Sequence, residues 1–141
     1  MIAGTRVSQI VSDILALDSR IRFVVLCNTD GKLLSSAGRE GKESIEPEEV
    51  TKLFLAQAAI GTGMAHSADG YHGPLRMVII QRERLMHILF NKAFGMVLIS
   101  AEPDLPLEKA GRLGRVVDSV ESGSRQVSSH QEWNQGVSGE A

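Results

Sequence analysis

The chain has 141 residues, 43% of them hydrophobic, and its 15 basic and 17 acidic side chains leave a net charge of -2. This length is typical of one domain with a real core, and the charge gives no reason to expect nucleic acid or an anionic membrane as a partner. Its apolar runs are far shorter than the roughly 18 residues of a membrane span, and its first residues, MIAGTRVSQ, lack the apolar segment of a signal peptide. We therefore expect a single-domain cytoplasmic protein.

The N-terminal part of the chain predicts a helix followed by a β-hairpin. Apolar residues between Val7 and Leu15 recur at the spacing of one helix face. The run 21–27, IRFVVLC, is apolar almost throughout, which is typical of a strand covered on both faces and favours the central strand of the sheet. Turn-forming residues at 28–31 predict that the chain doubles back through 32–37.

Two residue types near this run raise the question of a functional site. Cys27 is the single cysteine of the sequence, so it cannot form an internal disulfide, and we expect it to act as a small buried hydrophobe. Arg22 is the single charge in the run and is expected at the solvated start of the strand. A binding role for Arg20 and Arg22 is the alternative interpretation.

A second helix is predicted after the charged, glycine-containing connection 38–46. Pro47 followed by two glutamates is typical of a helix start, and the helix can extend to about His66. Apolar or small residues at helical spacing form the side that we expect to lie on the sheet. These residues are Val50, Leu53, Phe54, Ala58, Gly61, Met64 and Ala65.

The opposite side of the second helix carries the most informative stripe in the sequence. It consists of Leu55, Ala56, Ala59 and Gly63. The three small residues would let another helix approach closely. Because alanine is also a good helix former and a lone exposed leucine is common, an ordinary surface is one interpretation. The other is contact with a second copy of the chain or with a partner protein.

The segment 66–73 contains two histidines and one aspartate, which are residue types that bind metals. A zinc site needs three or four ligands held by ordered structure, and this glycine-rich segment has no second cluster of ligands beside it. Cys27 and His87 lie in predicted strands elsewhere. We therefore expect surface histidines here and no metal site.

The remaining sequence predicts three strands, a helix and a tail. Runs rich in β-forming residues and separated by short turns predict the strands at 75–81, 85–90 and 96–101. A proline-containing segment then stops the sheet before a helix at 107–120. Residues 122–141 are polar and rich in serine, glycine and glutamine, which predicts a disordered tail with one tryptophan, Trp133.

Together these elements predict an α+β fold, a five-stranded antiparallel sheet with flanking helices in the order α-β-β-α-β-β-β-α. The segments FVVLCNTDGKLLSSAG, LRMVIIQ, LMHILF and FGMVLISAEPDLPLEKAGRLGRVV resemble the roadblock/LC7 family of dynein light chains and GTPase regulators. The resemblance covers about residues 5–121, so we expect a roadblock/LC7-like domain at 1–121 and the tail at 122–141. The chain departs from the family in that tail and in a longer charged loop after the first hairpin.

A second likeness rests on a more specific pattern of residues. Asp18, Ile21-Arg22-Phe23, Gly31-Lys32-Leu33 and Arg39-Glu40-Gly41 match the pattern of a family of uncharacterised small archaeal proteins. That family offers no activity to carry over, so this likeness says nothing about function.

The roadblock/LC7 resemblance, in contrast, implies a function. Proteins of that family are homodimers or heterodimers whose long helices and middle strands pair, and many scaffold or regulate small Ras-like GTPases. The residues that the resemblance assigns to dimer or partner contacts are Leu55, Ala56, Ala59, Gly63, Val78, Ile79 and Ile80. Pairing of the strand at 78–80 with its symmetry mate would protect a sheet edge that is otherwise open to aggregation.

Three classes of function remain open from the sequence. The first is a noncatalytic homodimeric interaction module that acts on a small GTPase. The second is a small-molecule sensor with a PAS-like or profilin-like fold, whose ligand lies between the sheet and the second helix. An enzyme is the third, but no nucleophile elbow, phosphate loop or zinc motif is present, so we assign no catalytic, metal-binding or cofactor-binding residue. A dimer with a filled core would favour the first class, and a monomer with a cavity beside Phe54 the second.

Overall fold

The structure is a computed structural model that describes residues 4–41, 54, 57–58, 60–61, 63–64, 66–93 and 95–121. Its elements in chain order are α1 (Gly4–Leu15), β1 (Ile21–Asn28), β2 (Leu33–Gly38), η1 (His66–Ala68), α3 (Asp69–His72), β3 (Met77–Gln81), β4 (Met86–Lys92), β5 (Gly95–Ala101) and α4 (Leu107–Glu121). The described residues from 54 to 64 are helical, which agrees with the predicted second helix. The start of that helix at Pro47 and the tail 122–141 with Trp133 lie outside the described residues.

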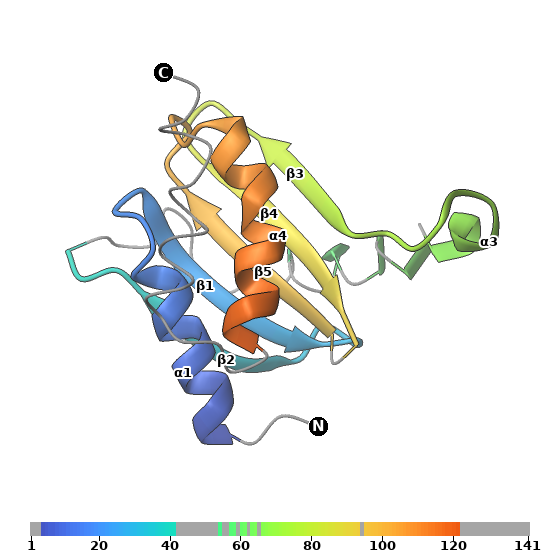
Figure 1. The fold of residues 1–141 in the computed structure, drawn as a ribbon, viewed down its shortest axis with the longest axis horizontal. Coiled ribbons are helices and arrows are strands. Elements are labelled where there is room, and N and C mark those ends of the chain that lie inside the picture. The colour runs from blue at the N-terminus through green and yellow to red at the C-terminus, as the bar shows by residue number, and fades with distance from the viewer. Residues whose placement is uncertain are drawn as a thin grey trace.

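The five strands form one antiparallel sheet in the order β2-β1-β5-β4-β3. The predicted α+β fold, with helices flanking a five-stranded antiparallel sheet, is therefore confirmed (Figure 1). The central strand is β5, however, so the prediction that the run 21–27 occupies the centre is wrong. Both β1 and β5 lie inside the sheet and both are apolar runs, so their hydrophobic patterns do not indicate which of the two is the central strand.

One face of the sheet is covered by α1 and α4 (Figure 1). The buried side chains that these helices contribute include Ile10, Val11, Ile14, Leu113, Val116 and Val117. The buried strand residues that meet them include Val24, Leu26, Ile88, Phe90, Val97 and Ile99. These side chains form one continuous cluster, which is the main core of the domain.

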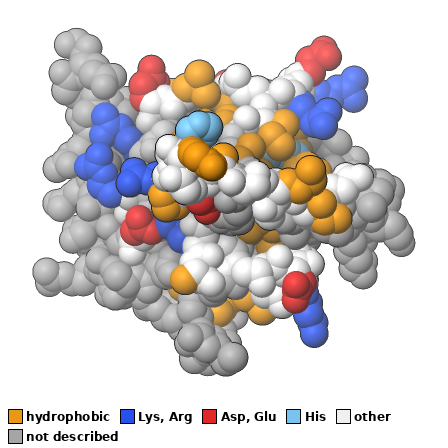
Figure 2. Space-filling model, turned by 90° about the vertical axis from the view of Figure 1, so that its right-hand side faces the viewer, with side chains coloured by type: hydrophobic (Ala, Val, Ile, Leu, Met, Phe, Trp, Pro, Cys, Tyr) orange, Lys and Arg blue, Asp and Glu red, His pale blue; other side chains and the backbone are white. Residues whose placement is uncertain are grey.

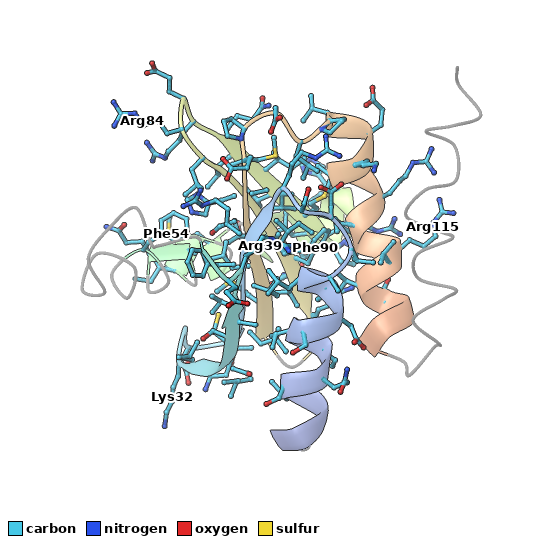
Figure 3. The ribbon with its side chains drawn as sticks, turned by 90° about the vertical axis from the view of Figure 1, so that its left-hand side faces the viewer. Lys32, Arg39, Phe54, Arg84, Phe90 and Arg115 are labelled. Carbon is cyan, nitrogen blue, oxygen red and sulfur yellow. The ribbon has the colours of Figure 1, made fainter. Side chains whose placement is uncertain are left out.

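The other face carries the alternate residues of the same strands. Those that are buried in its apolar cluster are Cys27, Leu89, Met96 and Leu98. Phe54 and Ala58 of the second helix pack against this cluster. In Figure 3, Phe54 lies on one side of the sheet, and α1 and α4 lie on the other. Because both faces are covered by apolar side chains, the inner strands read as nearly continuous apolar runs.

The first hairpin has the turn that the sequence predicts. The side-chain oxygen of Asn28 accepts hydrogen bonds from the backbone N–H groups of Asp30 and Lys32, at 3.0 and 2.9 Å. Gly31 has a φ angle of 85°, in the left-handed region that glycine adopts without steric cost. The hydrogen bonds of the Asn28 side chain and the left-handed conformation of Gly31 therefore allow the chain to reverse between β1 and β2.

Asp18 and Arg39, two residues of the more specific sequence pattern, hold α1 against the sheet. The guanidinium group of Arg39 donates hydrogen bonds to the backbone carbonyls of Ile21 and Asp18, both at 2.7 Å (Figure 3). It also donates to the carbonyl of Leu15 at the C-terminus of α1, where helix carbonyls lack partners within the helix. The Asp18 carboxylate accepts two hydrogen bonds from the Arg20 side chain, at 2.9 and 2.7 Å. These residues of the pattern therefore have a structural role.

The segment 66–73, which the sequence predicts as a loop, contains the short helices η1 and α3. The backbone N–H of Gly73 donates to the carbonyl of Asp69 at 2.9 Å, and Gly73 ends the helix with a φ of 85°. In Figure 1, α3 stands away from the sheet, beyond β3. A single helical turn buries no apolar face, so it leaves no hydrophobic period in the sequence by which it could be predicted.

Candidate interaction surface

An apolar groove lies between the second helix and β3. It has a volume of about 310 Å³. The helix lines it with Phe54, Ala58 and Gly61, together with the polar side chain of Gln57, and the strands line it with Val78, Ile80 and Leu89. The groove therefore lies on the face of the sheet opposite α1 and α4, beside Phe54, where the sensor alternative places a ligand.

Two large apolar side chains of the second helix are exposed next to this groove. The exposed fraction is 64% for Ile60 and 72% for Met64. They follow the groove residues Gln57 and Gly61 by three positions, so helical geometry places them alongside the groove. Tyr71 on α3, with an exposed fraction of 89%, adds a third large exposed side chain. Hydrophobic side chains are visible at the surface of the face that Figure 2 shows. Exposed apolar patches of this kind mark interaction sites.

Among the strands that the structure describes, β3 forms one edge of the sheet and has β4 as its one neighbour. Just before β3, the N–H of Asn91 donates to the carbonyl of Arg76 at 3.2 Å. Just after β3, the N–H of Arg82 donates to the carbonyl of Leu85 at 2.9 Å. Bonded and non-bonded residues alternate along an antiparallel pair, so the even-numbered residues of β3 face β4. The residues whose backbone groups point to the open edge are Met77, Ile79 and Gln81.

We call the groove, Ile60, Met64 and the open edge of β3 the edge surface. An unpaired strand edge offers a row of N–H and C=O groups to another strand. The edge surface thus combines apolar area with backbone groups that can form hydrogen bonds. It is chemically suited to bind a polypeptide.

The structure separates the three strand residues that the resemblance assigns to contacts. Val78 and Ile80 line the groove of the edge surface. Ile79 instead packs with the main core under α1 and α4, although its backbone points to the open edge. All three are half-buried. The twofold alternation of a strand explains the split, since neighbouring side chains point to opposite faces.

The outward stripe of the second helix is described only in part. Gly63 is exposed, as an outward position requires, whereas Leu55, Ala56 and Ala59 lie outside the described residues. The prediction that Met64 faces the sheet is wrong, because its side chain is mostly exposed. The sequence did not lead us to predict Ile60 as an exposed contact residue. Its position three residues before Gly63 was the signal, because that spacing places both residues on one side of a helix.

A buried histidine lies beneath the second helix. The ring of His87 on β4 stacks on the ring of Phe54, with 4.6 Å between ring centroids and 26° between ring planes. Only 6% of the surface of His87 is exposed. This aromatic contact anchors the helix to the sheet at one end of the groove.

The two arginines that could have formed a binding site are engaged within the chain. Arg20 pairs with Asp18 at 2.7 Å, and Arg22 pairs with Glu102 at 2.8 Å. The Arg22–Glu102 pair joins the start of β1 to the segment after β5, whereas the Arg20–Asp18 pair lies within the segment just before β1. The alternative of a binding role for these arginines therefore gains no support.

The residues with reactive or metal-binding potential are dispersed. Burial raises the pKa of the Cys27 thiol, against a smaller opposing effect of a hydrogen bond with the backbone of Met96, so the thiol stays protonated at neutral pH. Among the described residues, no three His, Cys, Asp or Glu side chains gather where they could hold a metal ion.

Within the part of the chain that the structure describes, no helix has the length and apolar character needed to cross a bilayer.

The structure of this chain is similar to known structures, whereas its sequence gives no match. No protein-family model matches the sequence, and no curated protein matches it. The fold, however, is similar to that of the gliding protein MglB from Thermus thermophilus, with a TM-score of 0.69 and 13% identity over 86% of this chain and 90% of the other. A roadblock/LC7 domain from Streptomyces avermitilis gives a TM-score of 0.62 and 15% identity over 82% and 92% of the two chains.

A third solved structure, MglC from Myxococcus xanthus, gives a TM-score of 0.55 and 10% identity over 85% of this chain and 98% of the other. Identities this low establish a shared fold and leave the similarity to small archaeal proteins a prediction. The matches cover nearly the whole of each known domain, so the likeness extends to the complete arrangement of helices and strands. The chain therefore has the roadblock/LC7 fold.

Proposed function

We propose that this protein is a noncatalytic, dimeric protein-interaction module of the cytoplasm that acts on a small Ras-like GTPase. The observation that supports the dimer is the edge surface, where an apolar groove, exposed Ile60 and Met64 and the open edge of β3 lie together. A second copy of the chain carries the same features, so a twofold axis beside β3 would satisfy both copies at once.

In this dimer, the two β3 strands pair in antiparallel fashion and join the sheets of both copies. Met77, Ile79 and Gln81 supply the backbone groups for that pairing. Ile60 and Met64 of each copy become covered, and full burial of such side chains contributes about 1.5–3 kcal/mol each. Four side chains of this size are of the right scale to offset the loss of free motion on association.

Sedimentation equilibrium tests the dimer directly. We expect the wild-type chain to have twice the monomer mass, and the variant Ile60→Arg to have the monomer mass because it places a charge in the contact. Leu107→Arg is a matched control, since Leu107 is an exposed hydrophobic residue on α4, outside the edge surface. A wild-type chain with the monomer mass at every concentration would refute the dimer. So would an Ile60→Arg variant that keeps the wild-type mass.

The GTPase partner is supported by the resemblance of residues 5–121 to the roadblock/LC7 family. Its test is a pull-down from native lysate with the immobilised protein, in the presence of GDP or of a nonhydrolysable GTP analogue. We expect a small GTPase to be captured in one nucleotide state and lost with the other. Capture that does not depend on the nucleotide, or capture of no GTPase, would contradict this part of the proposal and leave the dimer standing.

The groove beside Phe54 favours one second candidate, a sensor that binds an apolar small molecule. Its volume of about 310 Å³ and its mostly apolar lining suit such a ligand. Native mass spectrometry of the purified protein distinguishes the two functions. A monomer that carries a bound small molecule would support the sensor, and a ligand-free dimer would support the interaction module.

A further inference from the structure

A second groove lies on the other face of the sheet, between α4 and the end of the strand pair β3–β4. It has a volume of about 550 Å³. Met77 contributes apolar surface to it, the buried Phe90 ring lies behind its lining, and Gly111 and Gly114 form its wall on α4. We call it the α4 groove. The described residues that line it differ from those that line the groove of the edge surface.

Packing within the chain accounts for one of the two glycines of the α4 groove but not for the other. A Cβ atom on Gly114 would lie 3.2 Å from the Phe90 ring, so close packing within the chain accounts for this glycine. A Cβ atom on Gly111 would have no neighbour within 4 Å. Glycine is among the least favourable residues inside a helix, and packing within the described chain does not require it at 111. Its effect is to leave the wall of the groove bare, so that another backbone can approach closely.

The rim of the α4 groove is basic. Arg76 and Arg115 line it, both are exposed, and neither forms an ion pair with any described residue. Lys92 and Asp118 also line it and pair with each other, so their charges largely cancel. In Figure 2, lysine and arginine side chains gather on the left of the molecule, and Figure 3 shows Arg115 pointing outward from α4, away from the sheet. The groove therefore offers two guanidinium groups to an anionic partner.

We propose that the α4 groove binds an extended, acidic segment of a partner protein. The lining of α4 from Gly111 to Asp118 spans about 10 Å, which matches about three residues of extended chain. The bare glycine wall admits the backbone of that segment, and the half-buried Met77 offers an apolar contact to one of its side chains. The two arginines bind its carboxylates, for which the planar guanidinium group is the best-matched side chain.

The binding site can be tested without knowledge of the natural partner. A random-peptide display library is selected against the full-length protein, and the enriched peptides are synthesised with a fluorescent label for affinity measurements. We expect enriched peptides to carry aspartate or glutamate next to an apolar residue. We also expect Arg76→Glu and Arg115→Glu each to weaken their binding about tenfold or more, because each reverses a charge that faces the peptide. Arg84→Glu, an exposed arginine on the β3–β4 turn, is the matched control and should bind as the wild type does.

Gly111→Leu provides a test that changes no charge. Leucine fills the bare wall and should abolish peptide binding, while its better helix propensity keeps the melting temperature unchanged or raises it. Enrichment of no peptide, of peptides without acidic residues, or of peptides that bind Gly111→Leu with wild-type affinity would overturn the proposal. Loss of the wild-type oligomeric state in Arg76→Glu, measured as the mass of the particle in solution, would overturn it as well. In that case a second copy of the chain would occupy the groove.

Discussion

The two faces of the sheet differ in how completely the chain covers them. On the face of α1 and α4, side chains such as Ile14 and Leu113 have no exposed surface. On the other face, Phe54 packs against the strands, while Ile60 and Met64 on the same helix remain exposed. The comparison shows that apolar residues have two uses in this fold. The face of α1 and α4, which we call the completed face, buries its apolar core within the chain, with the arginine-rimmed α4 groove beside that core. The other face keeps exposed apolar side chains beside an open strand edge.

The largest expected effect comes from a truncation in the completed face. Leu113→Ala should lower the free energy of unfolding by about 2–5 kcal/mol, because it leaves a cavity among side chains that cannot collapse fully. Met64→Ala is the matched change on the other face and should alter the stability of the isolated monomer by about 0.5 kcal/mol or less. Urea unfolding of both variants at low protein concentration measures the contrast. Equal losses would show that the two faces do not differ.

A smaller effect is expected from the contact that joins α1 to the completed face. Arg39→Met keeps the aliphatic length but leaves the carbonyls of Leu15, Asp18 and Ile21 without their shared donor. We expect a loss of about 1–3 kcal/mol in the free energy of unfolding. Arg84→Met, at an exposed turn, should be nearly neutral. A neutral Arg39→Met would mean that water replaces the guanidinium group and that the contact does not secure α1.

The smallest stability effect is expected to depend on pH. Burial raises the pKa of the Asp18 carboxyl, but hydrogen bonds from Arg20 and the charges of Arg20 and Lys109 lower it by more, so the net pKa lies well below its usual range. The unfolded chain therefore takes up a proton at Asp18 more readily than the folded chain. The stabilisation is present above about pH 4 and is lost as pH falls below it.

The variant Asp18→Asn isolates this contribution. Urea unfolding at pH 7 and at pH 3 should show that wild type exceeds the variant in stability by more at pH 7 than at pH 3. The two measurements share every other titrating group, so the change in the difference belongs to Asp18. A difference that is equal at both pH values would contradict the assigned cause.

Much of the fold could be predicted because its signals are local. Runs of apolar and β-forming residues predicted β1, β3, β4 and β5, and helical spacing predicted α1 and α4. The turn-forming residues at 28–31 predicted the first turn and, through it, β2. The order of strands could not be predicted in the same way. Placing β5 at the centre depends on pairing between β1 and β5, which are distant in sequence, and two apolar runs of similar character leave that choice open.

The candidate site was predictable in outline only. The second helix and the strand at 78–80 were identified as contact elements, but the rotation of the helix about its axis placed Met64 outward and exposed Ile60. A rotation of one residue moves a side chain by about 100° around a helix, so a hydrophobic pattern with small residues on both sides fixes it poorly. The backbone groups of Ile79 point to the open edge because of the pairing register between β3 and β4. That register could not be predicted from the sequence.

Amide hydrogen exchange along β3, followed by NMR, tests most directly whether a second copy completes the open face. At concentrations where the chain is dimeric, the amides of Met77, Ile79 and Gln81 should be protected together with those of Val78 and Ile80. In Ile60→Arg, the first three should exchange rapidly while the other two stay protected by β4. Rapid exchange of Met77, Ile79 and Gln81 in the wild type at every concentration would contradict the account.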